Sequence, residues 1–292
     1  MKDQFNKGLL LTSLGSFWWG FIGVIYFQYV SFIGHIELVV HRCLWTAVML
    51  LLTTTFFSKW SLFKRIIKNK NYLFGLFISG FLIFINWAVW IYAVATERII
   101  DASFGYFIMP IISVLLGYIF FKEKLNKKRI FSIILVSISI LILIFFNLKS
   151  LPWVGLIVAF SWAFYNLIRK KIDVDTDIGL LIESLYILPF ALVAFYLIAK
   201  AGVNDFSFSN TGLSLFLILA GPMTVIPLFL YVRGVELIGL GPTGMIFYIT
   251  PTLQFILGYF YYNEDFSIIK FVSFIIIWIA VIIYLKDLYE TN

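Results

Sequence analysis

The chain is poor in charge, in cysteine and in histidine, and each shortage excludes a class of protein. Only 13% of its 292 residues are charged, against about 25% in a typical soluble domain, so a water-exposed surface cannot be built from it. Cys43 is the single cysteine, which excludes an intrachain disulfide, and His35 and His41 are the only histidines. These residues offer no usual metal-site spacing, and the phosphate-binding pattern GxxxxGK followed by Ser or Thr is missing. We therefore predict no cofactor, no metal and no ATP-driven step.

What the chain has instead is apolar residues in long runs. Hydrophobic residues make up 62% of it and aromatic residues 20%. A membrane-spanning helix needs about 20 mostly apolar residues, and only helices or closed barrels satisfy their backbone polar groups in lipid. The sequence predicts an all-α integral membrane protein with ten transmembrane helices and short connections. The ten runs are 8–30, 35–57, 71–95, 100–121, 129–147, 152–170, 178–199, 212–232, 241–261 and 268–286.

The basic residues indicate how the chain sits in the membrane. The net charge of +7 would suit a nucleic-acid partner, but the Lys and Arg residues stand in the short connections between apolar runs. If the N-terminus and every second connection share one side, that side holds 17 of the 22 basic residues and the other side four, with Arg42 inside a run. Cytoplasmic loops are enriched in Lys and Arg. We therefore expect both termini in the cytoplasm and no nucleic-acid partner.

Two segments of the chain repeat each other. Residues 107–123 read FIMPIISVLLGYIFFKE and residues 248–264 read YITPTLQFILGYFYYNE. Each has a proline near its start, then a Leu-Gly-Tyr triplet, then a glutamate five residues beyond the tyrosine. The segments end the fourth and the ninth run, so the repeat unit is five helices, and an odd number inverts the second copy. The sequence predicts two inverted five-helix halves, residues 1–147 and 148–292.

Inverted repeats are a common way to build alternating access around a site near the membrane midplane. We therefore predict a secondary active transporter for a small organic metabolite: an amino acid, an amine or a drug-like amphiphile, with a possible coupling proton. One alternative is a polytopic membrane enzyme, but neither HExxH nor GxSxG is present. The other is a passive channel or facilitator, although no selectivity-filter sequence is evident. The predicted partners are the lipid bilayer and the small-molecule substrate, and the sequence leaves open a monomer or a homodimer.

The chain resembles the EamA branch of the drug/metabolite transporter superfamily in its ten runs, its five-helix repeat and the Pro, Leu-Gly-Tyr and Glu pattern. A finer pattern resembles the RarD subgroup over nearly the whole chain. It consists of Phe17-Trp18-Trp19-Gly20, Glu37, His41-Arg42, Trp45, Asn86-Trp87, Ala102-Ser103-Phe104-Gly105-Tyr106-Phe107, Tyr165, Arg169-Lys170-Lys171, Glu183 and Tyr248-Ile249-Thr250-Pro251. The resemblance implies a bacterial cytoplasmic-membrane transporter with a central cavity between its halves. Phe247 departs from the subgroup, which commonly has Gln there, so a polar ligand contact is expected to be absent.

Polar residues inside apolar runs are costly, and each is a candidate for a site. Glu37 and His41 stand four residues apart on one helical face, with Arg42 beside them. They either form a charge cluster that binds substrate or titrates, or a structural ion pair at the outer interface. Glu183, in the seventh run, is expected to pair with His41 or Arg42 across the cavity or to carry a coupled proton. A hydrogen-bonded structural carboxyl is the alternative.

Other candidates follow from helical spacing. Tyr165 and Arg169 share one stripe of the sixth run; Arg169 begins a basic triplet and is expected at the interface, whereas Tyr165 lies deeper. Asn86 should face protein or water, and Trp90 shares its helical face. Tryptophan faces attract cations, so an aromatic cage for an amine is one hypothesis and lipid contact for these rings is the other.

We predict no catalytic residue and nine residues that line the substrate site. Pro110 and Pro251 are expected to interrupt the fourth and ninth runs as matched hinges, because a mid-helix proline removes a backbone hydrogen bond and bends the helix. The nine lining residues are Trp19, His41, Arg42, Asn86, Trp90, Tyr106, Tyr165, Glu183 and Tyr248.

Overall fold

The structure is a computed structural model, and it describes residues 2–95, 99–147, 153–172, 174–207, 209–261 and 268–291. The part of the chain so described contains helices and connections without a strand. The helices are α1 (Lys2–Phe17), the π-helix η1 (Trp18–Ile22), α2 (Gly23–Tyr29), α3 (His35–Phe56), α4 (Trp60–Ile66), α5 (Lys70–Ala95), α6 (Ile99–Phe121), α7 (Lys127–Asn147), α8 (Trp153–Ile172), α9 (Thr176–Lys200), α10 (Thr211–Ile238), α11 (Leu240–Ile246), α12 (Ile249–Phe260) and α13 (Ile268–Thr291).

Helix length and exposed apolar side chains mark an integral membrane protein. Phe56 is 82% exposed, Phe145 81% and Phe260 76%; a surface so rich in phenylalanine is stable against lipid tails and not against water. Within the described residues, seven helices are long and apolar enough to cross a membrane, and a shorter apolar helix covers Gly105–Phe121. The seven are Asp3–Tyr29, His35–Phe56, Lys70–Ala93, Lys127–Phe146, Thr176–Lys200, Thr211–Ile238 and Ile268–Thr291.

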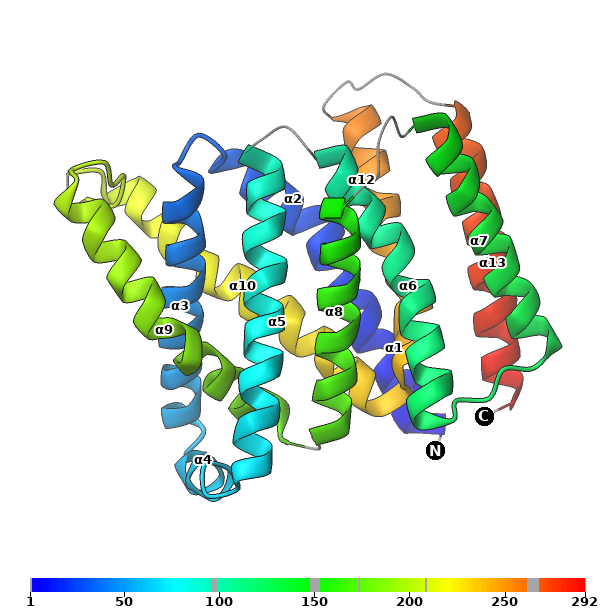
Figure 1. The fold of residues 1–292 in the computed structure, drawn as a ribbon, viewed down its shortest axis with the longest axis horizontal. Coiled ribbons are helices and arrows are strands. Elements are labelled where there is room, and N and C mark those ends of the chain that lie inside the picture. The colour runs from blue at the N-terminus through cyan, green and yellow to red at the C-terminus, as the bar shows by residue number, and fades with distance from the viewer. Residues whose placement is uncertain are drawn as a thin grey trace.

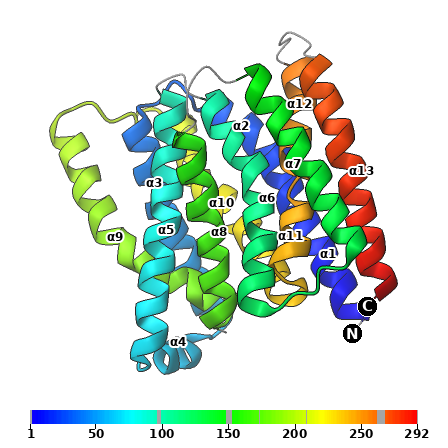
Figure 2. The ribbon, with the colours of Figure 1, turned by 45° about the vertical axis from the view of Figure 1, so that its right-hand side comes forward.

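The helices pack side by side, and both termini lie at the same end of the bundle (Figure 1). We call this end the termini end; α4 lies there as well, whereas the connection between α2 and α3 lies at the opposite end. One edge of the bundle is the pair α7 and α13, and the other is α3 with α9 (Figure 2). Between them α8 packs against α5 and α6, while α10 packs against α1 and α3. The site is built where these inner helices meet.

Two of the predicted runs contain an irregular segment, and the two irregular segments lie beside each other. Run 8–30 continues through the π-helix η1, and run 241–261 has a turn at Phe247 and Tyr248, between α11 and α12. η1 packs directly against α12. π-helical turns of this kind occur frequently at functional sites.

The prolines act differently from the matched interruptions that the sequence suggested. Pro251 is the third residue of α12, where its missing N–H has no helical partner to lose, so it starts the helix after the break. Pro110 lies inside α6, which continues past it from Ile99 to Phe121. The helix therefore does not break at Pro110, since a packed membrane helix tolerates a proline without ending, and the role of Pro110 as a hinge stays a prediction.

Candidate functional site

A central cavity of about 70 Å³ lies among the inner helices, in the half of the molecule away from the termini end. That placement follows from the chain: Arg42 is in the second turn of α3 and Trp90 in the last third of α5, and both helix ends face away from the termini. Five of the nine predicted lining residues contribute to it: Trp19, Arg42, Asn86, Trp90 and Tyr106. The remaining lining residues are Gly23, Val24, Phe27, Trp87, Trp162, Phe247, Thr250 and Gln254.

The two spans with irregular segments, α1–η1–α2 and α11–α12, meet at the cavity. The Thr250 hydroxyl donates to the Ser16 carbonyl oxygen at 2.9 Å, which fixes the start of α12 against the end of α1. Gly20 in η1 faces the same stretch, and a Cβ atom there would stand 2.9 Å from the Thr250 carbonyl oxygen. Only glycine permits this approach of two backbones. The lining residues Trp19 and Phe247 are presented by these irregular segments.

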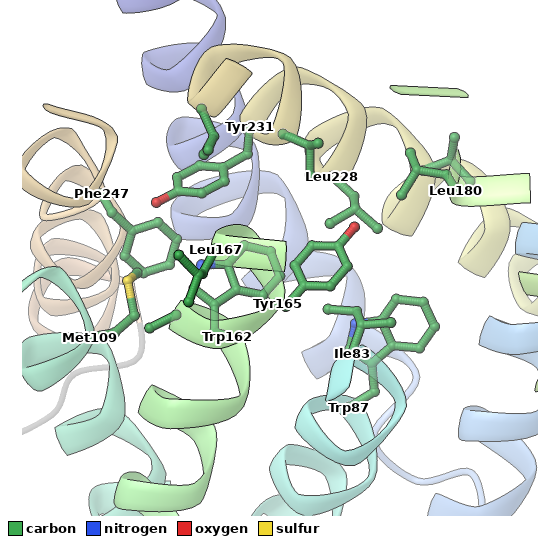
Figure 3. Packing of buried hydrophobic residues seen from close by; sticks show 14 of the residues in the cluster. Ile83, Trp87, Met109, Trp162, Tyr165, Leu167, Leu180, Leu228, Tyr231 and Phe247 are labelled. Atoms are coloured by element: carbon green, nitrogen blue, oxygen red, sulfur yellow. The ribbon is translucent and has the colours of Figure 1, made fainter. Parts of the chain in front are cut away.

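An aromatic layer borders the cavity toward the termini end. It consists of Trp19, Trp162, Tyr165, Tyr231 and Phe247. Trp162 is at its centre, with ring centroids 5.1 Å from Trp19, 5.4 Å from Tyr231 and 5.6 Å from Tyr165. Figure 3 shows Trp162 between Phe247 and Tyr231 on one side and Tyr165 on the other. Trp19, Trp162 and Phe247 of this layer line the cavity, and Tyr165 and Tyr231 pack against Trp162 from outside it.

Of the described residues that line the cavity, Arg42 alone carries a charge. It is 7% exposed, and its Nε donates to the Thr224 hydroxyl of α10 at 3.0 Å. Its guanidinium carbon lies 4.6 Å from the Trp87 ring centroid and 5.2 Å from that of Phe27. These rings give the cation partial compensation through their negative faces, but the arrangement leaves it without a carboxylate.

Asn86 joins two helices at the cavity. Its side-chain amide donates to the Val158 carbonyl oxygen at 2.9 Å and to the Ser161 hydroxyl at 3.1 Å, both on α8. The prediction that this amide faces protein is confirmed. Trp90, one helical turn on, contacts Phe27 edge to face at 5.5 Å.

Glu183 lies in a second, buried polar cluster, apart from the cavity. It accepts hydrogen bonds from Ser79 at 2.5 Å and from Tyr165 at 3.3 Å, and Arg169 lies 3.5 Å away. The sequence suggested His41 or Arg42 as the partner of Glu183, and this prediction was wrong, because the carboxylate pairs with Arg169. Arg169 is 1% exposed, so its expected place at the interface was wrong as well. The counter-charge of Glu183 holds it inside the protein.

A small space of about 10 Å³ adjoins this cluster and is lined by Glu183, Thr46 and Trp87 among others. It is large enough for roughly one water molecule. Trp87 lines both this space and the central cavity. Trp87 is therefore shared by the wall of the Arg42 cavity and the wall of the space beside Glu183.

His41 does not line the cavity. Its Nε2 lies 3.4 Å from Glu37, its Nδ1 accepts from the Trp45 indole at 3.1 Å, and its ring packs against Phe206. Glu37 also accepts the backbone N–H groups of Asp205 and Phe206 at 2.9–3.0 Å. Of the two readings of this pair, the structural one fits: it fixes the start of α3 to the connection after α9.

Tyr248 also points away from the cavity. Its hydroxyl donates to the Phe107 carbonyl oxygen at 2.8 Å, so it ties the break in span nine to α6. Its neighbour Phe247 enters the cavity in its place, and its ring lies 5.7 Å from that of Tyr106. Phe247, which stands where the RarD subgroup commonly has Gln, thus lies in the cavity wall. Helical spacing could have suggested Gln254, seven residues further on.

Ion pairs and hydrogen bonds join the two halves of the chain at the termini end. Glu123, after α6, accepts the N–H groups of Leu240 and Gly241 at 2.8 and 2.9 Å and lies 3.1 Å from Lys170. Lys59, after α3, lies 2.6 Å from Asp177 at the start of α9. These contacts hold the halves together below the aromatic layer. The repeat counterpart of Glu123, Glu264, lies outside the described residues.

The helical bundle, its lipid-type surface and a partly polar central cavity fit a membrane transporter. The sequence model of the EamA-like transporter family matches residues 6–145 and 150–286. The chain belongs to this family, within the drug/metabolite transporter superfamily, and is RarD-like.

Several relatives match along most of their length. Protein RarD of Escherichia coli (strain K12) is 34% identical over 289 residues, 99% of this chain and 97% of that one. The uncharacterized transporter YojE of Bacillus subtilis (strain 168) is 33% identical over 96% of this chain and 93% of its own. The chloramphenicol-sensitive protein RarD of Pseudomonas aeruginosa is 24% identical over 85% and 83%. A solved crystal structure, 11% identical, has the same fold with a TM-score of 0.72 over 96% of this chain and 97% of that chain.

Proposed function

We propose that the protein is a secondary active transporter that moves a small organic metabolite across the bacterial cytoplasmic membrane by alternating access. The observation that carries this proposal is the position of the central cavity. Both halves of the chain, 1–147 and 148–292, line it, and we take the aromatic layer and the termini-end ion pairs as its closed side. A site with one closed side is what one state of an alternating-access carrier requires.

The packing of the helices supports ten spans in two inverted halves. In a repeat of five, the span of α1 corresponds to α8, α3 to α9, α5 to α10, α6 to α11 and α12, and α7 to α13. The contact of α1 with α10 then has its counterpart in α8 with α5, and that of α3 with α10 in α9 with α5. The pairs α3 with α9 and α7 with α13 map onto themselves. This pairing supports a two-fold relation between the halves, and the odd number of spans in each half would place its axis in the membrane plane.

The two termini lie at one end, and the excess of Lys and Arg in the sequence belongs to that end. By the positive-inside tendency we assign the termini end to the cytoplasm. The closed side of the cavity is then the cytoplasmic side. This state would receive or release substrate at the outer face.

We propose Glu183 as the site of a coupling proton. The groups that face it are Ser79 on α5 and Tyr165 and Arg169 on α8. Two nitrogens of Arg169, Nε and Nη1, have no hydrogen-bond partner among the described residues; Glu183 is its nearest counter-charge, and Glu236 and Asp175 act on it from further away. Protonation of Glu183 would leave a buried cation without its nearest counter-charge, which would favour separation of α8 from α9 and opening of the cytoplasmic side.

Exchange in proteoliposomes tests the transporter proposal. Vesicles are loaded with a mixture of amino acids, aromatic acids, amines and chloramphenicol, the last because of the name of the Pseudomonas relative, and efflux is followed by mass spectrometry. A carrier gives saturable efflux that external substrate accelerates. A channel gives efflux that neither saturates nor responds to external substrate, and an enzyme gives a chemically altered product; either outcome contradicts the proposal.

A further inference from the structure

Three arginines are buried in the described part of the chain, and their surroundings differ. Arg129 lies 2.9 Å from Asp287, and Arg169 lies 3.5 Å from Glu183. Arg42 has no Asp or Glu oxygen within 4.0 Å among the described residues. A buried cation without a counter-charge is costly, and such a cost persists where another molecule supplies the charge.

Within the part of the chain that the structure describes, the remainder of the cavity wall offers Arg42 no negative charge either. The polar side chains there are Asn86, Tyr106, Thr250 and Gln254, and the rest of the wall is apolar or aromatic. Glu183, which the sequence suggested as a partner for Arg42, pairs with Arg169 instead. Among the described residues, the cavity wall therefore carries one positive charge and no carboxylate.

The aromatic rings of the cavity wall further restrict which class of ligand can bind there. The faces of Trp87 and Phe27 already hold the guanidinium of Arg42, so an amine entering the cavity would meet a cation where an aromatic cage should be. Arginine presents a planar set of donors that fits a carboxylate in two-point fashion. Trp19, Trp90 and Phe247 offer apolar surface for the rest of the ligand.

We infer that the cavity takes an organic carboxylate with a flat apolar body, bound through its carboxylate to Arg42. The inference rests on the proposed function for its physiological role, but it concerns binding and can be tested apart from transport. It excludes amines as substrates, because the ring faces that would form an aromatic cage for an amine already contact Arg42.

Thermal unfolding with a thiol-reactive dye tests the inference, because Cys43 is the single cysteine and is buried. The probes are 3-phenylpropionate, 3-phenylpropylamine and 3-phenylpropanol, which share one body and differ only in the charge of the end group. A ligand that binds the folded state raises the melting temperature. Only the carboxylate should raise it, and Arg42→Gln should weaken its binding by roughly ten- to a hundredfold.

Two variants keep the result interpretable. Arg42→Lys preserves the charge without the planar donors and should retain part of the response. Arg65→Gln removes an exposed arginine on α4 and should retain all of it. Arg42→Gln should melt no lower than the parent protein, since it removes an uncompensated charge and keeps a donor for Thr224.

The inference is overturned if the amine or the alcohol stabilises as well as the carboxylate, if the carboxylate has no effect up to its solubility, or if its effect persists in Arg42→Gln. Flux of the same carboxylate in proteoliposomes separates this result from the proposed function. Binding without saturable flux would uphold the anion site and contradict the transporter.

Discussion

At the scale of residues, the buried pair of Glu183 and Arg169 makes the sharpest prediction of stability. Glu183→Gln keeps a side chain that can bond Ser79 but leaves Arg169 without its counter-charge. Removing one partner of a buried pair costs about 3–5 kcal/mol. We expect this loss in chemical unfolding in detergent, and we expect the double variant with Arg169→Met to recover most of it. A double variant no more stable than the single one would show that the two charges are not paired.

The same cluster predicts a pH response of transport. If Glu183 carries the coupling proton, Glu183→Gln should leave exchange at equal pH on both sides measurable but remove its acceleration by a pH gradient. Ser79→Ala is the control, because it removes one hydrogen bond to Glu183 and keeps the ion pair. Gradient-driven flux that is unchanged in Glu183→Gln would place the coupling elsewhere or exclude it.

At the scale of elements, the contact of η1 with α12 depends on a glycine. In Gly20→Ala the new Cβ would meet the Thr250 backbone at 2.9–3.0 Å, where no flexible side chain can yield. Overpacking of this kind costs about 1–3 kcal/mol, so both the melting temperature and the exchange rate should fall. Gly34→Ala is the matched control, since nothing lies within 4 Å of its Cβ. Equal behaviour of the two variants would contradict a close contact at Gly20.

The two prolines should differ although the repeat relates them. Pro110 lies in the interior of α6, whereas Pro251 lies in the first turn of α12. Pro110→Ala restores a backbone N–H in the middle of a helix, so it should raise the melting temperature and, if α6 bends during transport, slow the exchange. Pro251→Ala should change both little. A larger effect on exchange from Pro251→Ala would place the hinge at the break in span nine instead.

At the scale of the whole molecule, the sequence predicted the class well and the contacts of the site only in part. Runs of apolar residues set the membrane class, because length and composition alone decide which segments can lie in lipid. The rule that polar residues inside apolar runs mark sites correctly predicted that Arg42 and Asn86 line the cavity. The rule could not decide whether His41 and Glu183 belong to a site or to a structural pair, since a buried charge is equally costly in both. Only the fold shows which partner each of them meets.

Local backbone breaks account for most of the remaining differences. Phe247 and Tyr248 are adjacent, and the turn between α11 and α12 decides which of them enters the cavity. Trp162 was missed because many aromatic rings of such a chain face lipid, and nothing in its spacing marks the centre of the aromatic layer. Arg169 was misplaced because the basic triplet it begins looks like an interfacial anchor.

Alternating access requires that the two ends of the molecule open in turn. Double electron–electron resonance in lipid nanodiscs measures this directly, in a Cys43→Ala background with spin labels on two pairs of exposed residues. The first pair, Tyr92 with Tyr259, measures the distance between α5 and α12 beside the cavity. The second pair, Lys124 with Lys171, measures the distance across the contact between Glu123 and Lys170 at the termini end, which we call the seam. We predict that Glu123→Gln, which weakens that seam, lengthens the second distance and shortens the first. Distances that change together, or a single unchanged distance for both pairs, would contradict alternating access.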